Sequence, residues 1–169
     1  MELSTSDHFT SKADATGFIN VLGTQIKFCT APTEDDHDYC LLEGALPNAV
    51  IVPLHSHLER ETFFIIHGRM QGFKDGLWHE LSPGQVFDVP GNVQHAFRNT
   101  SGDRVSMIAV TTARMGRFFS EVGRPPESVP PGPPSVGEVE RFTRTAQAYG
   151  YWFASPEENA AIGLNLMPP

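Results

Sequence analysis

The sequence has few basic residues and no long apolar run. Only 12 lysines and arginines stand against 20 aspartates and glutamates, which gives a formal net charge of -8. Proteins bind a phosphate backbone through clustered positive charge, so this balance argues against a nucleic-acid partner. No apolar stretch approaches the roughly 20 residues of a membrane helix, and residues 1–12 are polar where a secretory signal would be basic and then apolar. We therefore expect a cytoplasmic protein with no membrane partner.

Cysteine is also scarce, because Cys29 and Cys40 are the only two in 169 residues. A single pair is too few for the disulfide framework of a domain of this size. Neither cysteine stands in a C-x-x-C or C-x-x-H pattern, which argues against a metal or redox role. Since strand-like residues flank both, we expect buried, reduced thiols.

Residues 17 to 112 lack helical periodicity and contain short β-rich runs separated by turn residues, as in sandwiches and barrels. Asp75-Gly76 has the composition of a type I′ hairpin turn, in which both central residues need a positive φ. The sequence predicts strands at 18–22, 25–29, 38–43, 49–54, 62–66, 70–74, 77–81, 85–89, 94–99 and 104–111. At this length we expect one hydrophobic core and a single domain over residues 1–169.

The tail, residues 113–169, has a different pattern from the barrel region. Residues 115–119 could begin a short helix, and the proline-rich connector 124–134 should be extended. Two S-x-x-E capping boxes follow, at Ser135 and Glu138 and at Ser155 and Glu158. We predict one or two short helices, packed on the outside of the barrel or over its mouth.

The segment 53–68 contains the most informative side chains. His55 and His57 are two residues apart, so on a strand they share a face and can converge on one metal ion. A carboxylate could join them from Glu61 or from Glu59, and spacing alone does not decide between the two. Near the start of a second short strand, His95 could supply a fourth ligand. The other histidines, His8, His37, His67 and His79, have no matching partner and are predicted to be surface or edge residues.

These two segments resemble the cupin family, whose motifs read G-x5-H-x-H-x3-E-x6-G and G-x5-P-x-G-x2-H-x3-N. The matching residues are His55, His57, Glu61 and Gly68 in the first motif and Gly84, Pro90, His95 and Asn99 in the second. Two motif glycines are replaced, by Ala49 and Asn92, and neither position is a ligand. The resemblance implies an all-β jelly-roll (double-stranded β-helix) barrel, with Glu61 rather than Glu59 as the carboxylate ligand and Glu59 as a solvated neighbour.

Three imidazoles and one carboxylate suit one divalent transition metal, Fe, Ni, Mn, Co or Zn, better than Mg or Ca. Such metals favour five or six ligands, so one or two positions would stay open for a substrate. The alternation that turns the histidines inward predicts an apolar substrate pocket around the ion, formed by Ile51, Phe63, Ile65, Phe97 and Met107.

Within the cupins, the ligand set and the tail resemble the single-domain quercetinase-like dioxygenases. That resemblance implies a small aromatic or enolic substrate bound to the metal, with Glu61 as both ligand and general base, and a homodimer. Two alternatives share the same four ligands. One is a non-oxidative isomerase or polyketide cyclase that uses Zn(II), and the other is a non-catalytic module that binds a small molecule.

Overall fold

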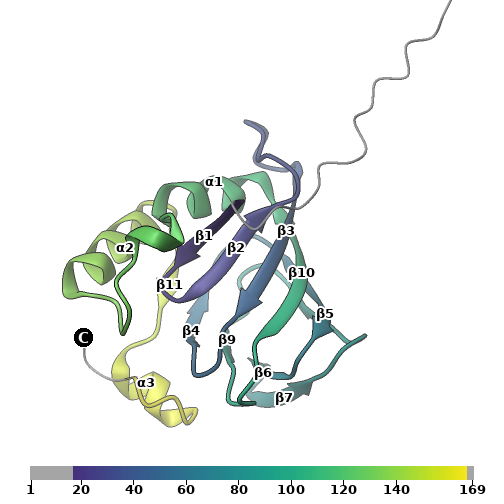
Figure 1. Cartoon of the computed structure of the whole chain (residues 1–169), viewed down its shortest axis with the longest axis vertical. Helices are drawn as coiled ribbons and strands as arrows, with labels where there is room; N and C mark the ends of the chain where they lie inside the picture. Colours follow the sequence, from purple (N-terminus) through teal and green to yellow (C-terminus); the bar gives the residue numbers. More distant parts are fainter. Residues whose placement is uncertain (1–16, 167–169) are drawn as a thin grey trace, which may run out of the picture.

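The computed structural model describes residues 17–166, in which two antiparallel sheets face each other and enclose the core (Figure 1). The polar residues 1–12 and His8 lie outside the described residues. Together the sheets form the predicted jelly-roll barrel. None of the helices in residues 17–166 is long and apolar enough to cross a membrane.

The larger sheet has six strands in the order β1-β2-β3-β10-β5-β8. Their bounds are β1 Phe18–Val21, β2 Thr24–Phe28, β3 Tyr39–Leu46, β5 Glu61–His67, β8 Val86–Val89 and β10 Val105–Thr112. Strand β10 lies between β3 and β5 in the interior of this sheet. Its buried residues alternate with more exposed ones, which is the pattern of a strand with one face on the core. Its buried residues, Val105, Met107, Ala109 and Thr111, point into the barrel.

The smaller sheet has five strands in the order β11-β4-β9-β6-β7. Their bounds are β4 Ile51–Ser56, β6 Met70–Lys74, β7 Leu77–Leu81, β9 His95–Arg98 and β11 Trp152–Phe153. Each of the ten strands predicted from the sequence is present, with ends shifted by up to three residues. Strand β11 was not predicted from the sequence, because a strand of two residues has no periodicity and forms only by pairing with β4.

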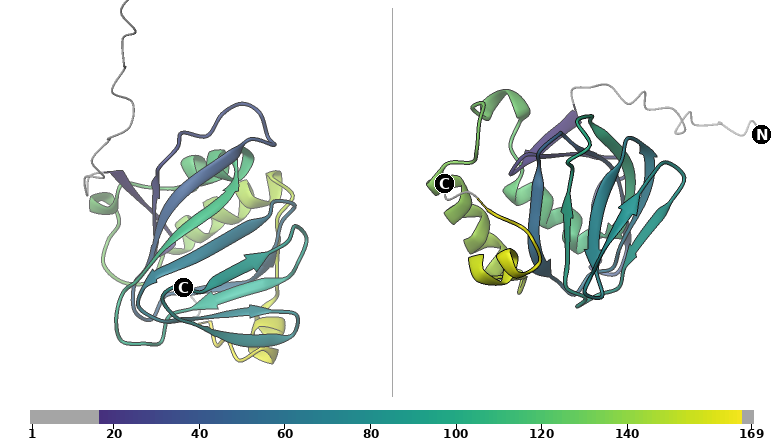
Figure 2. Two further views of the ribbon diagram at one scale, coloured as in Figure 1. Left: turned by 90° about the vertical axis from the view of Figure 1, so that its right-hand side faces the viewer. Right: turned by 90° about the horizontal axis from the view of Figure 1, so that it is seen from below.

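The tail adds helices α1 Ala113–Val122, α2 Val136–Ala148 and α3 Pro156–Ala161, which gather on one side of the barrel (Figure 2). Both predicted capping boxes are present, at the starts of α2 and α3. The prediction of one or two helices was too low, because α1 begins directly after β10 and runs for a full 10 residues. The connector is not wholly extended either, since η2 Pro126–Ser128 is a 3-10 turn.

The two cysteines differ in their surroundings. Cys40 is buried in the core, and burial raises the pKa of its thiol. Cys29 is exposed, so the expectation of a buried thiol was wrong at this position. The reason is that β2 ends at Phe28, which leaves Cys29 in the loop that leads to β3.

Positive φ angles mark the turns that connect the strands. Asp75 and Gly76 have φ of 54° and 78°, as predicted for the hairpin between β6 and β7. Asn92, which replaces a motif glycine, has φ of 65°, a region that asparagine tolerates better than most residues. Ala49, which replaces the other motif glycine, has φ of 67° and therefore holds its Cβ in a strained left-handed conformation.

Ala49→Gly is expected to stabilise the protein, because it removes this strain from an exposed residue that buries no packing surface. The free energy of unfolding should rise by about 0.5 to 1 kcal/mol, measured by urea denaturation. Ala31→Gly, at an exposed position without a positive φ, is the control and should lower it slightly. Equal effects of the two changes would refute the strain at Ala49.

Candidate metal centre

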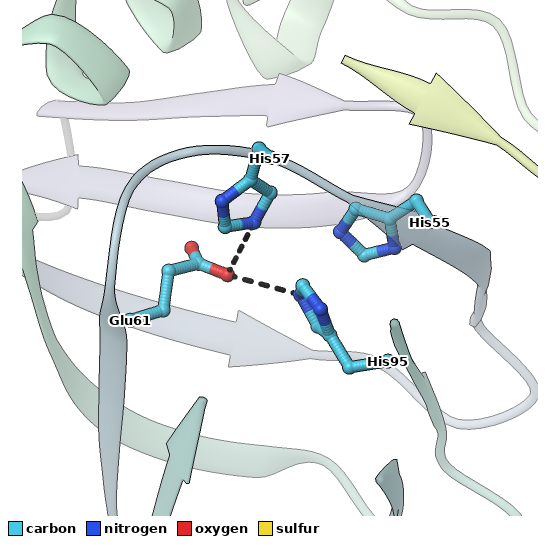
Figure 3. Close-up of side chains that lie close together, drawn as sticks. All are labelled: His55, His57, Glu61 and His95. Carbon is cyan, nitrogen blue, oxygen red and sulfur yellow. Dashed lines mark ion pairs between the residues drawn. The ribbon is translucent and has the colours of Figure 1, made fainter. Parts of the chain in front are cut away.

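Four side chains from three strands and one loop meet inside the barrel (Figure 3). His55 lies on β4, His57 in the loop that follows, Glu61 at the start of β5 and His95 at the start of β9. The pairing of β4 with β9 sets His55 opposite His95. All four are buried, and one ligand atom from each lies within 4.8 Å of the others. The structure thus brings together the four residues chosen from the sequence.

Each imidazole ring is oriented by a hydrogen bond from its Nδ1 atom to a backbone carbonyl oxygen. The distances are 2.8 Å from His55 to Pro53, 3.0 Å from His57 to Glu59 and 2.8 Å from His95 to Val93. A carbonyl oxygen can only accept, so Nδ1 must carry the proton. In the neutral ring the lone pair is then on Nε2, which is the arrangement of a metal-binding histidine.

The Nε2 atoms of His57 and His95 are buried and have no hydrogen-bond partner. Each lies 3.3 to 3.4 Å from Oε2 of Glu61, and Figure 3 shows both converging on that oxygen. Buried polar atoms without partners are rare in native proteins and need an explanation. A cation between these donors would satisfy all of them at once, so the residues fit a divalent transition metal.

The electrostatics of the cluster favour the charged form of Glu61 and the neutral form of His55. Burial by itself favours the neutral acid, but His57 and His95 outweigh it and hold the pKa of Glu61 well below its usual range. Burial and the neighbouring imidazoles lower the pKa of His55. Burial opposes the charged form of His57, but the carboxylates of Glu61 and Glu59 outweigh it and raise the pKa of this residue. Metal binding requires a charged Glu61 and neutral imidazoles, which matches the pKa directions at Glu61 and His55.

The loop after β4 and the loop before β9 contact each other closely, which brings His57 near the strand that contains His95. The backbone N of Asn92 donates a hydrogen bond to the carbonyl oxygen of His57 at 2.6 Å. A Cβ on Gly91 would lie 2.1 Å from the carbonyl oxygen of Leu58, so only glycine fits there. Local sequence reasoning did not identify Gly91, because its constraint comes from a loop more than thirty residues away.

Glu59 is not a solvated neighbour, and that expectation was wrong. It is buried and forms an ion pair with Arg114 of α1. Its Oε2 lies 3.6 Å from Nδ1 of His57, on the side of the ring that faces away from the cluster. This burial has no local signal in the sequence, because Arg114, which compensates the charge, is 55 residues away in the chain.

Three of the candidate ligands line a cavity of about 290 Å³: His55, His57 and Glu61. Of the predicted pocket residues, Ile51, Phe63, Phe97 and Met107 line it. Ile65 does not, because its fully buried side chain belongs to the core instead. The tail supplies another part of the wall, with Phe118 and Phe119 from α1, Val139 and Phe142 from α2, and Tyr151 and Phe153 around β11. Helices α1 and α2 therefore border the cavity, whereas no residue of α3 lines it.

The histidines predicted to be surface residues behave as expected where the structure describes them. His37, His67 and His79 are all exposed. Within residues 17–166, the cluster around Glu61 is the single group of histidines, cysteines and acidic residues with the spacing of a metal site.

Comparisons with known proteins agree with this fold. Residues 42–111 match the family model of the cupin domain. Over these residues the chain is therefore similar to a cupin domain, and its barrel has the cupin fold.

Among curated proteins, the chain is similar to the quercetin 2,3-dioxygenase of Bacillus subtilis (strain 168), with 26% identity over 107 residues. The match covers 63% of this chain but only 32% of that relative. Among solved structures, an RmlC-like cupin from Shewanella frigidimarina NCIMB 400 aligns with a TM-score of 0.52 and 18% identity, over 64% of this chain and 92% of that one. The polyketide cyclase RemF from Streptomyces resistomycificus aligns with a TM-score of 0.49 and 18% identity, over 57% of this chain and 68% of that one.

The protein should bind one divalent transition-metal ion per chain. Elemental analysis after dialysis against Co(II) should find one equivalent in the wild type and in His79→Ala, whose histidine is exposed, but much less in His95→Ala. Metal at one hundred times its Kd should raise the thermal midpoint by about 5 to 10 °C in the first two proteins only. Equal metal content in His95→Ala would refute the site.

Arg114→Leu should lower the free energy of unfolding by about 3 kcal/mol, because it leaves the buried carboxylate of Glu59 without its partner. Combining it with Glu59→Leu should restore most of the loss, since the unpaired charge is then absent. Arg60→Leu removes the exposed ion pair to Asp88 and should change stability by less than about 1 kcal/mol. Urea denaturation of five proteins measures this: the wild type, Arg114→Leu, Glu59→Leu, the double variant and Arg60→Leu. A double variant whose loss equals the sum of the two single losses would contradict it.

Proposed function

We propose that this protein is a metal-dependent dioxygenase that acts on a small aromatic or enolic molecule. The observation that carries the proposal is the position of the cluster, three histidines and one glutamate at the end of an apolar cavity. A closed structural site would be sealed by protein on all sides, whereas three of these ligands face open space. The site therefore has room for a substrate beside the ion.

The lining of the cavity favours a flat, largely apolar substrate. Phenylalanines from both sheets and from the tail make up much of the wall, and Phe63 and Phe97 contact each other edge to face at 4.9 Å between ring centroids. Aromatic walls favour aromatic ligands because their rings stack or meet edge to face. The polar ligand atoms at one end would select the orientation in which an oxygen of the substrate points toward them.

When bound, the metal would hold a deprotonated hydroxyl of the substrate and lower the barrier for its reaction with dioxygen. Glu61 has two roles in this proposal. One of its carboxylate oxygens is a ligand, and the group lies beside the position of the substrate hydroxyl, where it can accept the proton. The lowered pKa of Glu61 keeps its carboxylate charged, and therefore free of a proton, before the substrate binds. The apolar side chains of α1 and α2 that border the cavity would limit the access of bulk water to the reacting atoms.

The similarity to a quercetin 2,3-dioxygenase supports the oxidative reaction and a flavonol-like substrate. Because the matched segment spans about a third of that relative, the activity of the whole relative is carried over only as part of this proposal. The homodimer and the cytoplasmic location stay predictions from the sequence.

Oxygen uptake with a flavonol tests the proposal. Protein loaded in turn with Fe, Mn, Co, Ni and Zn is mixed with quercetin in an oxygen electrode, and at least one metal should give steady consumption of dioxygen. Glu61→Gln should reduce the rate at least 100-fold, because the amide cannot accept the proton. His79→Ala, far from the cavity, should keep the wild-type rate.

The other outcomes separate the alternatives. Conversion of a substrate by the Zn(II) protein without dioxygen would favour the isomerase or cyclase. Binding without conversion by any metal form would favour the non-catalytic module. Either result would overturn the dioxygenase.

A further inference from the structure

The tail brings one buried hydroxyl group into the apolar cavity. Tyr151 is 6% exposed, lines the cavity, and its hydroxyl group has no hydrogen-bond partner. Its ring lies against the metal-ligand candidate His57, at 5.4 Å between ring centroids. A buried hydroxyl without a partner destabilises a folded protein, so its presence beside the ligand cluster needs an explanation.

The side chain of Tyr151 is held firmly in this position. The backbone N of Tyr151 donates to the carbonyl oxygen of Ala146 at 2.9 Å, which fixes the turn that ends α2. Its ring meets Phe118 edge to face at 4.7 Å between centroids, and the guanidinium of Arg114 lies 5.8 Å from the ring centre. Two residues further on, Phe153 pairs with His55 in the sheet. Contacts on both sides thus prevent the hydroxyl from turning outward to water.

The chemistry of this hydroxyl defines the kind of group that fits it. Burial and the carboxylate of Glu59 raise the pKa of Tyr151, so the phenol stays protonated. A protonated phenol without a partner can donate one hydrogen bond into the cavity and can also accept one. The complementary group is a hydroxyl, which can donate as well as accept.

We propose that Tyr151 is a specificity-determining residue that binds a hydroxyl group of the substrate, separate from the oxygen held by the metal. This inference rests on the proposed function, and it narrows the substrate class to aromatic molecules with at least two oxygen groups. One oxygen would be held at the cluster, and a hydroxyl elsewhere on the molecule would meet Tyr151. The apolar walls would contact the ring system between them.

Binding of two flavonols to the Zn(II)-loaded protein without dioxygen tests this. Quercetin and 3-hydroxyflavone share the metal-binding oxygens, but quercetin has four more hydroxyl groups. Tyr151→Phe should weaken quercetin binding about 3- to 10-fold, measured by fluorescence titration, and leave 3-hydroxyflavone unchanged. Tyr149→Phe is the matched control, because it removes a hydroxyl that bonds Glu121 outside the cavity, and it should bind both as the wild type does.

Thermal stability gives a second readout that does not depend on the ligand. Tyr151→Phe should raise the thermal midpoint of the unliganded protein by about 2 to 4 °C, because it removes an unpaired buried hydroxyl. Tyr149→Phe should not raise it, because that hydroxyl has a partner. A lower midpoint in Tyr151→Phe would show that the hydroxyl is used structurally, and would overturn the inference.

Failure of the inference is distinguishable from failure of the proposed function. Equal quercetin binding by Tyr151→Phe and the wild type overturns the role of Tyr151, even if dioxygen is consumed. Selective loss of quercetin binding without any dioxygen uptake supports the role and overturns the dioxygenase. If the wild-type protein binds neither flavonol, the assigned substrate class is wrong.

Discussion

Three hydrogen bonds from imidazole Nδ1 atoms to backbone carbonyl oxygens set the arrangement on which this protein depends. Each bond turns the Nε2 lone pair of His55, His57 or His95 toward the centre of the barrel. The carbonyls belong to residues two positions away from each histidine, so the backbone that builds the strand ends also orients the rings. Without these hydrogen bonds each ring could rotate, and each Nε2 atom could find a hydrogen-bond partner of its own. With it, two Nε2 atoms remain unpaired and converge with Glu61 on a common point.

The tail completes the site and is more than an appendage to the barrel. Helix α1 supplies Arg114, which compensates the buried charge of Glu59 and reaches the carbonyl oxygen of Tyr149 at 2.6 Å. The turn after α2 positions Tyr151, and β11 joins the sheet beside β4. A buried ion pair gives little net stability by itself, and in this position it links the tail to the loop that contains His57 and Glu59. The tail and the ligand cluster are thereby coupled.

Much of the barrel followed from local pattern. Alternation of buried and exposed residues located all ten strands of residues 17–112, and the Asp75-Gly76 turn was recognised because its geometry is fixed by two adjacent residues. Errors arose where the environment came from distant segments. Glu59 looked like a solvent-facing residue until Arg114 was placed beside it. Cys29 looked strand-like, but β2 ends one residue earlier. Ile65 shares the parity of Phe63 and is buried, yet it lies in the core and not in the cavity wall.

The sequence by itself determined the β-rich architecture and the pair His55 and His57, because the order and spacing of neighbouring residues carry both. Glu61 and His95 were singled out by the resemblance of their segments to the two cupin motifs. Only the tertiary structure decided which groups surround those ligands. The size of the cavity, the burial of Glu59 and the unpaired hydroxyl of Tyr151 depend on how residues from α1, α2 and β11 pack against strands formed more than fifty positions earlier. Such contacts leave no local signature, since they arise from the packing of surfaces and not from the order of residues along one segment.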